Sequence, residues 1–484
     1  MTSSSTRRQF LFSSLAASVS LHAAPLRPNI VFLLPDQLRA QALGCMGNKD
    51  VQTPNFDKLA AEGILLKNTF ANTPVCCPAR AILLTGKYTS GNGMVANDLR
   101  LRESEVTIAK ILQREGYRTG FIGKWHLDGG PRMPGFVPPG PRRQGFEYWA
   151  ANECSHAHFN NQYFKNDATP IPMPKFEAEG WTDLALEFLS SAKTDKRPFF
   201  VTIQMGPPHD PYKAPPEYFA KYDPAKLELR PNYKKTDRAP SREQIAHYYG
   251  MVTAVDDQLG RMMAKLDELG LRDNTIFIIC SDHGDMLGSH GERLKRKPYE
   301  ESIRVPGIIR WPQKIKKGQT SEMLFSHIDV APTLLGMCGV KPPASMQGHN
   351  LAATITTGKG PKPDSVLFQI FGPYIGDETP RGWRGLRTAK HMYARFENKP
   401  WMLFDLEADP YEMNNLAADP GAVPIRKQLD EKLTAKMKAS GDSWSKNWVH
   451  LVEDAGRLYK DQTFYTVDEY LNWAAKNGVV VPKI

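Results

Sequence analysis

The sequence predicts an α/β protein with a large, mostly parallel sheet that helices cover on both faces. Three short apolar runs have the continuous hydrophobic character of strands buried on both sides: Ile30–Leu34, Phe199–Ile203 and Thr275–Ile279. Helical patterns lie between them, and strands that alternate with helices favour a parallel sheet. The 484 residues are 41% hydrophobic and 24% charged, which is a globular composition and excludes wholesale disorder or a fibrous fold.

Two helices are predicted by apolar residues at helical spacing and by a glycine near their ends. The first pattern runs over residues 106–112 and stops before Gly116. The second runs over residues 245–266 and stops before Gly270, a residue type suited to a helix C-cap. We interpret Asp256–Asp257, inside the second helix, as part of a solvated or salt-bridged face.

The remaining segments predict loops and a smaller C-terminal unit. Residues 129–144 are rich in Gly and Pro and predict an irregular loop, and the polar stretch 222–243 predicts a surface insertion. From residue 364 the pattern changes to short strands followed by a helix. We therefore expect a catalytic α/β domain over residues 25–363 and an α+β subdomain over 364–484. The strands expected there are Val366–Ile370, His391–Phe396 and Trp401–Asp405, and the helix carries Ile425, Leu429, Leu433 and Met437 on one face.

The N-terminus has the pattern of an export signal. Residues 1–24 combine Arg7–Arg8, a following Phe10–Leu11 and a short apolar run, which resembles the twin-arginine type. We expect this segment to be removed and the protein to be periplasmic or secreted, because no later apolar run is long enough to span a bilayer.

The chain is basic, with a formal net charge of +10 and a sequence pI of about 9.1. Removal of the two signal arginines would lower the net charge to +8. Such a charge suits a nucleic-acid binder, a membrane-surface protein or an enzyme for anionic substrates. No recognisable motif or dense basic run indicates nucleic-acid binding.

Acidic residues follow two of the predicted strands. Asp36 comes after the strand at 30–34, and Asp282 comes after the strand at 275–279, with His283 next in the chain. Because ligands of open α/β sheets bind beyond the carboxyl ends of the strands, the two carboxylates are predicted to share a site. Carboxylate oxygens favour a hard cation such as Ca²⁺ or Mg²⁺. The alternative is that each Asp is a helix cap or turn residue.

The segment from Cys76 to Gly86 combines a sulfur, a proline and a basic residue at helical spacing. Pro78 suits the first turn of a helix, so Cys76 would lie at the helix N-terminus, where backbone N–H groups favour anions. Arg80, one turn later, points back toward the same end. The pattern indicates an anion pocket with Cys76 at its floor. The alternative is that Cys76 and Cys77 are small buried hydrophobic residues.

Cys76-x-Pro78-x-Arg80, followed by Thr85-Gly86, resembles the signature of the formylglycine-dependent sulfatases of the alkaline-phosphatase-like superfamily. The resemblance extends over nearly the whole chain and implies that fold, with a sulfuric-ester hydrolase activity of the bacterial carbohydrate type. The other segments that resemble family motifs, in family order, are Arg27–Gln37, Gly123–Leu127, Pro207–His209, Ser281–Gly284, Lys295 with Tyr299–Pro306, and the three pieces Phe404–Leu406, Asp409–Pro410 and Asn415–Leu416.

The resemblance implies a role for each matching residue. A maturation enzyme would oxidise Cys76 to formylglycine, whose hydrate attacks sulfur with one hydroxyl and then uses the other to expel sulfate. Arg80 and His126 would orient the hydrate. The sulfate oxygens would be bound by Lys124, His209 and Lys295, and His209 is the expected general acid for the leaving oxygen.

The resemblance also implies a Ca²⁺ site that activates the sulfate group. Its ligands would be Asp36, Gln37, residue 76, Asp282 and His283. Gln37 stands where many members have Asp, and it could still offer its amide oxygen. His283 stands where many members have Asn, and a nitrogen ligand keeps Mg²⁺ and Mn²⁺ as candidates.

The expected substrate is a sulfated sugar. Loops 129–144 and 150–165, with the short segment between them, carry six residues that could line a sugar pocket: Arg142, Arg143, Tyr148, Trp149, His156 and His158. The alternative is that these are ordinary surface residues. Two alternatives fit the same residues. One is a phosphate or phosphonate ester hydrolase on the same scaffold, and the other is a secreted, non-catalytic glycan-binding protein with an unmodified Cys76.

Overall fold

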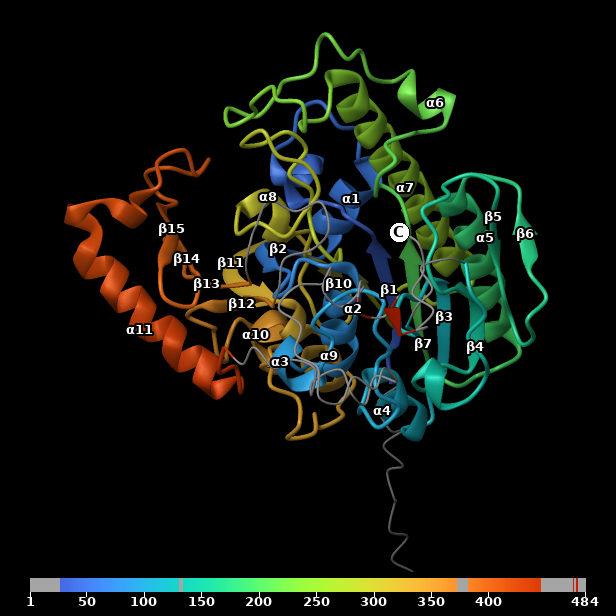
Figure 1. The fold of residues 1–484 in the computed structure, drawn as a ribbon. Coiled ribbons are helices and arrows are strands. Elements are labelled where there is room, and N and C mark those ends of the chain that lie inside the picture. Colours follow the sequence, from blue (N-terminus) through green and yellow to red (C-terminus); the bar gives the residue numbers. More distant parts are fainter. Residues whose placement is uncertain (1–26, 130–133, 372–381, 445–472, 474–475, 478–484) are drawn as a thin grey trace, which may run out of the picture.

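The computed structural model describes residues 27–129, 134–371, 382–444, 473, 476 and 477 (Figure 1). The predicted signal segment 1–24 lies outside the described residues. Of the predicted C-terminal subdomain, the structure describes residues 364–371, 382–444, 473, 476 and 477. In the described part of the chain, no helix has both the length and the apolar character needed to cross a membrane.

The large sheet is mostly parallel, as predicted. Its strand order is β11-β2-β10-β8-β1-β7-β3-β4, and β9 pairs with β2. The neighbours β8, β1, β7, β3 and β4 are all parallel, whereas β10 runs antiparallel to β2 and β8. The strands are β1 (Asn29–Pro35), β2 (Ile64–Phe70), β3 (Arg118–Lys124), β4 (Tyr148–Asn152), β7 (Phe199–Met205), β8 (Thr275–Ile279), β9 (Arg304–Val305), β10 (Ile308–Arg310) and β11 (Gln319–Ser326).

Helices cover both faces of this sheet, because alternate side chains of each strand point to opposite sides. In β1, Ile30 and Phe32 belong to one hydrophobic core, and Val31 and Leu33 belong to the other. The first core is covered by α2 (Cys76–Thr85), α4 (Ile108–Arg114) and α9 (His327–Met337). The second is covered by α1 (Pro54–Glu62), α5 (Glu177–Ser190) and α7 (Arg242–Glu268) (Figure 1).

The predicted strands at 30–34, 199–203 and 275–279 are confirmed as β1, β7 and β8. The two predicted helices are confirmed as α4 and α7, and Gly270 follows α7 with a φ of +64°, a conformation that favours glycine. The predicted loop at 129–144 holds only a short 3-10 helix at Pro141–Arg143 among its described residues.

Asp256 corrects one prediction. Its side chain is fully buried where α7 packs beside α1, and its carboxylate accepts hydrogen bonds from the backbone N–H of Phe56 (2.7 Å) and of Asn55 (3.1 Å). The interpretation of a solvated helix face is therefore wrong for Asp256. The physical reason is that the free N–H groups at the start of α1 need an acceptor.

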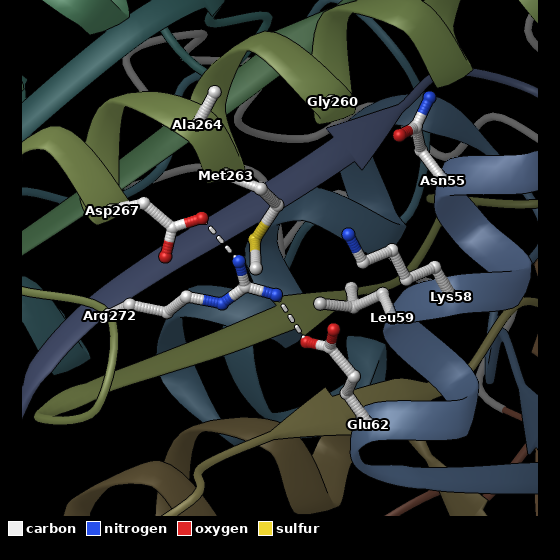
Figure 2. A pocket seen from close by; sticks show the side chains of 9 residues that line it. All are labelled: Asn55, Lys58, Leu59, Glu62, Gly260, Met263, Ala264, Asp267 and Arg272. Atoms are coloured by element: carbon white, nitrogen blue, oxygen red, sulfur yellow. Dashed lines mark hydrogen bonds and ion pairs between the residues drawn. The ribbon is translucent and has the colours of Figure 1, made fainter.

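A cavity of about 110 Å³ lies between α1 and α7 (Figure 2). Arg272 crosses it and pairs with Glu62 of α1 and with Asp267 of α7. Because two helices hold one guanidinium, the contact ties α1 to α7 on this side of the sheet.

The short elements lie around the large sheet. Residues 222–241 contain no helix or strand, and all but Tyr222, Leu227, Asn232 and Pro240 are exposed or half-buried, as expected for a surface insertion. The short elements are α3 (Thr89–Asn92), β5 (Asn161–Tyr163), β6 (Ile171–Met173), α6 (Pro216–Phe219), α8 (Glu300–Ile303) and α10 (Ala352–Thr357).

An antiparallel sheet near the C-terminus packs against the first core on one face and against α11 (Val423–Ala439) on the other. Phe368 lies in the large core, whereas Leu367 packs with Leu429 and Leu433 of α11. Figure 1 shows this sheet and α11 at one side of the molecule, in orange. The domain boundary after residue 363 stays a prediction. The strands are β12 (Val366–Ile370), β13 (Trp383–Arg387), β14 (His391–Arg395) and β15 (Pro400–Asp405).

Candidate active site

The predicted site residues converge beyond the carboxyl ends of four neighbouring strands. Asp36 follows β1, Lys124 ends β3, His209 lies in the loop after β7, and Asp282 lies in the loop after β8. Since these strands are parallel, their carboxyl ends meet at one edge of the sheet. Cys76 is the first residue of α2 and reaches the same edge.

Four buried side chains form a cluster at this edge: Asp36, Cys76, Asp282 and His283. Each offers an atom that lies within 4.8 Å of the others. The His283 Nε2 atom is 3.6 Å from Asp36 Oδ1 and 3.7 Å from Asp282 Oδ1. Asp36 Oδ1 is buried without a hydrogen-bond partner. Burial and the neighbouring Asp36 carboxylate raise the pKa of Asp282. A free buried oxygen beside a second carboxylate and an imidazole fits a divalent cation.

Two basic side chains balance the negative charge of these carboxylates. Arg80 Nη2 lies 2.9 Å from Asp36 Oδ2 and 2.9 Å from Asp282 Oδ2, and Lys124 Nζ lies 2.8 Å from Asp36 Oδ2. Burial opposes the ionisation of Asp36, but Lys124, His209 and Arg80 outweigh it and hold its pKa well below the usual range. Asp36 is therefore a carboxylate inside the protein.

Cys76 lies beside two carboxylates, but the positive side chains around it have the larger effect on its thiol. Its Sγ atom is 3.3 Å from His283 Nε2, and the side chain is 2% exposed. Burial opposes ionisation of the thiol, yet Lys295, Lys124 and His283 hold its pKa well below the usual range. By contrast, burial raises the pKa of the neighbouring Cys77. The site thus stabilises an anion at residue 76 and not at residue 77. All six cysteines are free thiols.

A second group of polar side chains lies around Lys295. Its Nζ atom is 2.9 Å from His209 Nε2 and 2.6 Å from Gln37 Oε1. The amide of Gln37 donates from Nε2 to Asp285 Oδ2 over 2.6 Å. The oxygen of Gln37 therefore faces Lys295, and a contact with a cation would require Lys295 to release it.

One hydrogen bond of each ring orients His209 and His126. His209 donates from Nδ1 to the backbone oxygen of Asp210 over 2.6 Å, which leaves Nε2 directed at Lys295. His126 is 2% exposed, and its Nε2 lies 3.2 Å from Asp98 Oδ1. Burial opposes protonation of His126, but neighbouring thiols and Asp98 raise its pKa well above the usual range.

The sequence does not reveal three residues that position this site. Gln204 accepts a hydrogen bond from Arg80, Asp98 holds His126, and Asp285 holds Gln37. Gln204 and Asp98 lie outside every recognised segment, so no sequence pattern marks them. Asp285 follows the segment Ser281–Gly284 directly, and its position there is the only signal that could have found it.

Most of the residues expected to line a sugar pocket make packing or ion-pair contacts within the protein instead. Trp149 is 2% exposed and stacks on Phe121 at 5.0 Å, so that expectation is wrong for this residue. The reason is that Trp149 points into the first core from β4. Only His156 touches two predicted site residues, Lys124 and His209. Of the others, Arg143 lies over the Trp149 ring, Arg142 pairs with Asp128, Tyr148 packs on Phe188, and His158 is buried against Glu177.

Comparison with known proteins places this site in a family. The sequence profile of the sulfatase family matches residues 28–340, and the profile described as "N-sulphoglucosamine sulphohydrolase, C-terminal" matches residues 288–439. The chain is 39% identical to an ulvan-active sulfatase of Formosa agariphila, over 87% of this chain and 83% of that protein. It is 29% identical to an N-acetylglucosamine-6-O-sulfatase of Bacteroides thetaiotaomicron, over 86% of this chain and 87% of that protein.

The fold agrees with the sequence comparison. A crystal structure from Bacteroides fragilis, described as a sulfatase, superimposes with a TM-score of 0.81 at 31% identity. The superposition covers 88% of this chain and 98% of that structure. A family profile that matches well over half of the chain, together with a relative of this identity and coverage, establishes the family of the chain. The chain belongs to the sulfatase family and is a sulfuric-ester hydrolase.

Proposed function

We propose that the protein releases inorganic sulfate from a sulfated carbohydrate, with residue 76 as its nucleophilic centre. The observation that carries this proposal is that Cys76 lies in one buried cluster with two carboxylates and a histidine, in the electrostatic field of Lys124 and Lys295. Two relatives are named as an ulvan-active sulfatase and an N-acetylglucosamine-6-O-sulfatase. These names support a carbohydrate as the leaving group.

We assign the cation to Asp36, Asp282, His283 and residue 76, and we propose Ca²⁺, with Mg²⁺ or Mn²⁺ as alternatives. Gln37 becomes a further ligand if Lys295 turns away from its oxygen. The cation would supply polarisation of the sulfate oxygens, and Cys76, converted to formylglycine by a maturation enzyme, would supply a hydrate hydroxyl as the nucleophile.

The residues of the chain bind and orient the ester. Lys124 and Lys295 lie close enough to Cys76 to dominate its charge environment, so they are placed to bind the sulfate oxygens. His126, fixed by Asp98, is placed to orient residue 76. Arg80 keeps Asp36 and Asp282 in position from one guanidinium. His209 Nε2 accepts from the Lys295 ammonium, so we propose that it receives that proton and passes it to the leaving oxygen.

Removal of the cation is expected to destabilise the protein. A ligand present at about 100 times its dissociation constant adds about 2.7 kcal/mol to the free energy of unfolding, so EDTA should lower the thermal midpoint and Ca²⁺ should restore it. Asp282→Asn should abolish this response, because it removes one of the two carboxylates. The matched control is Asp223→Asn, an exposed acid in the surface insertion. A calcium response that survives in Asp282→Asn would refute the assigned site.

The substrate class is tested with a panel of sulfated mono- and oligosaccharides, together with 4-nitrophenyl sulfate and 4-nitrophenyl phosphate. We expect sulfate release from at least one sugar, with a kcat/KM at least about 100-fold above the value for 4-nitrophenyl phosphate. Faster release of phosphate than of sulfate from every substrate would favour a phosphoric-ester hydrolase instead.

We further propose that the chain is exported to the periplasm or the medium after conversion of Cys76. The support is the twin-arginine pattern of residues 7–11, because that route carries folded proteins. Replacement of Arg7–Arg8 by Lys-Lys should retain the enzyme in the cytoplasm, and normal export of this variant would contradict the proposal.

A further inference from the structure

His156 lies beside the proposed sulfate-binding residues but outside the segments that resemble family motifs. Its ring stacks on that of His209, with centroids 4.5 Å apart and planes inclined by 15°. Its Nε2 atom lies 3.5 Å from Lys124 Nζ. His156 therefore touches two of the three residues to which sulfate binding is assigned.

His156 approaches these residues from the less buried side. Lys124 is 2% exposed and turns its ammonium inward to Asp36, whereas His156 is only partly buried. The inner side is filled by the carboxylate cluster and residue 76. A sulfate group held by Lys124, His209 and Lys295 would therefore have its alcohol on the side where His156 lies.

The contact with Lys124 determines which nitrogen of His156 carries the proton. An ammonium group has only donors, so Nε2 must accept and the neutral ring carries its hydrogen on Nδ1. Burial, Lys124 and His209 together hold the pKa of His156 well below its usual range, so the ring is neutral. Among the described residues, no group hydrogen-bonds to Nδ1. His156 thus has one N–H donor that the described protein leaves unused.

The loop that carries His156 is held firmly next to His209. Two residues later, His158 is 3% exposed and lies with Nε2 2.6 Å from the backbone oxygen of His209. Its Nδ1 lies 2.6 Å from Glu177 Oε1, and the other oxygen of Glu177 accepts from Trp181 Nε1 over 3.0 Å. This buried chain of contacts fixes His156 relative to His209, as a specificity residue requires.

We propose that His156 binds the substrate by donating a hydrogen bond from Nδ1 to an oxygen of the leaving alcohol, next to the ester that is cleaved. The inference rests on the proposed function and deepens it. A neutral donor at this place selects an alcohol that carries a neighbouring hydroxyl or ether oxygen, as sugars do, and adds no third charge to the sulfate. His156 would therefore recognise the sugar, whereas Lys124, His209 and Lys295 recognise the sulfate.

The test measures binding, so that it does not depend on turnover. In the Cys76→Ala background, calorimetry compares the tightest-binding sulfated sugar of the panel with inorganic sulfate. His156→Ala should weaken binding of the sugar by about 10-fold, which corresponds to the loss of one hydrogen bond. It should weaken binding of inorganic sulfate by less than about twofold. His156→Phe, which keeps a stacking ring without the N–H, should show the same loss.

Two further variants separate the hydrogen bond from packing. His156→Asn retains a donor near the Nδ1 position and should recover sugar affinity to within about threefold. His391→Ala, in the C-terminal sheet, is the control for removal of an imidazole. Full affinity in His156→Phe, or an equal loss for the sugar and for sulfate in His156→Ala, would overturn the assignment. Failure of the proposed function shows separately, as absence of sulfate release by the wild-type enzyme from a sugar that binds.

Discussion

Replacement of Cys76 by Ala is expected to lower kcat for sulfate release by at least about 10⁴-fold, because the variant has no nucleophilic centre. Lys124 and His283 each contact Asp36 independently of the sulfur, and Asp36, Asp282 and His283 would still be available to the cation after residue 76 is lost as a ligand. The loss should therefore appear in kcat, whereas the affinity for inorganic sulfate should change little. Sulfate release by ion chromatography and sulfate binding by calorimetry measure the two quantities.

Cys77→Ala is the matched control for this prediction. Cys77 is also fully buried in the first turn of α2, but burial raises the pKa of its thiol and it contacts the backbone N–H of Asp98. We expect this variant to keep kcat within about fivefold of the wild-type value, since it removes packing and no reacting group. If Cys76→Ala retained the activity of Cys77→Ala, the nucleophile would have to be a different residue.

Replacement of His209 by Asn is expected to lower kcat on a sulfated sugar by about 10²- to 10⁴-fold, the usual contribution of a general acid. The Nε2 atom of His209 is the only ring nitrogen directed at Lys295, because Nδ1 is engaged by the Asp210 backbone. A sugar alcohol is a poor leaving group and needs a proton, which His209 would pass on after receiving it from Lys295. The effect on 4-nitrophenyl sulfate should be far smaller, because nitrophenolate leaves without protonation.

The contrast between the two substrates is the measurement that checks this role. Steady-state kcat values for both substrates, in wild type and in His209→Asn, give two ratios. His158→Asn provides a comparison, because it loosens the same loop without removing the group that faces Lys295. Equal losses on the sugar and on the nitrophenyl ester would exclude proton donation and leave His209 as a sulfate-binding residue.

The sequence allowed the central architecture to be predicted because hydrophobic patterns report burial directly. The continuous apolar runs at 30–34 and 275–279 are central strands, buried on both faces. Strand β13 (Trp383–Arg387) was not predicted, because its Trp-Arg-Gly-Leu-Arg sequence carries two buried arginines. Arg384 pairs with Asp442 and Arg387 with Glu300, so the charges are satisfied only by distant partners.

The candidate site could be predicted only where residues follow a local pattern. Asp36 and Asp282 follow strands, and Cys76 begins a helix, so the sheet topology brings them together. The partners that hold the site, such as Gln204 for Arg80, depend on side-chain contacts across the sheet and carry no local signal. Asp256 was misinterpreted for the same reason, because its partner is the N-terminus of another helix.

The proposed mechanism depends on conversion of residue 76 to formylglycine inside this anion site. Mass spectrometry of the peptide that contains residues 76–80, from protein produced together with a formylglycine-generating enzyme, tests it most directly. We expect the mass of an aldehyde at residue 76 and of an unmodified thiol at residue 77, with sulfate release proportional to the converted fraction. A peptide that carries only thiol at residue 76, in a preparation that releases sulfate at the full rate, would contradict the account.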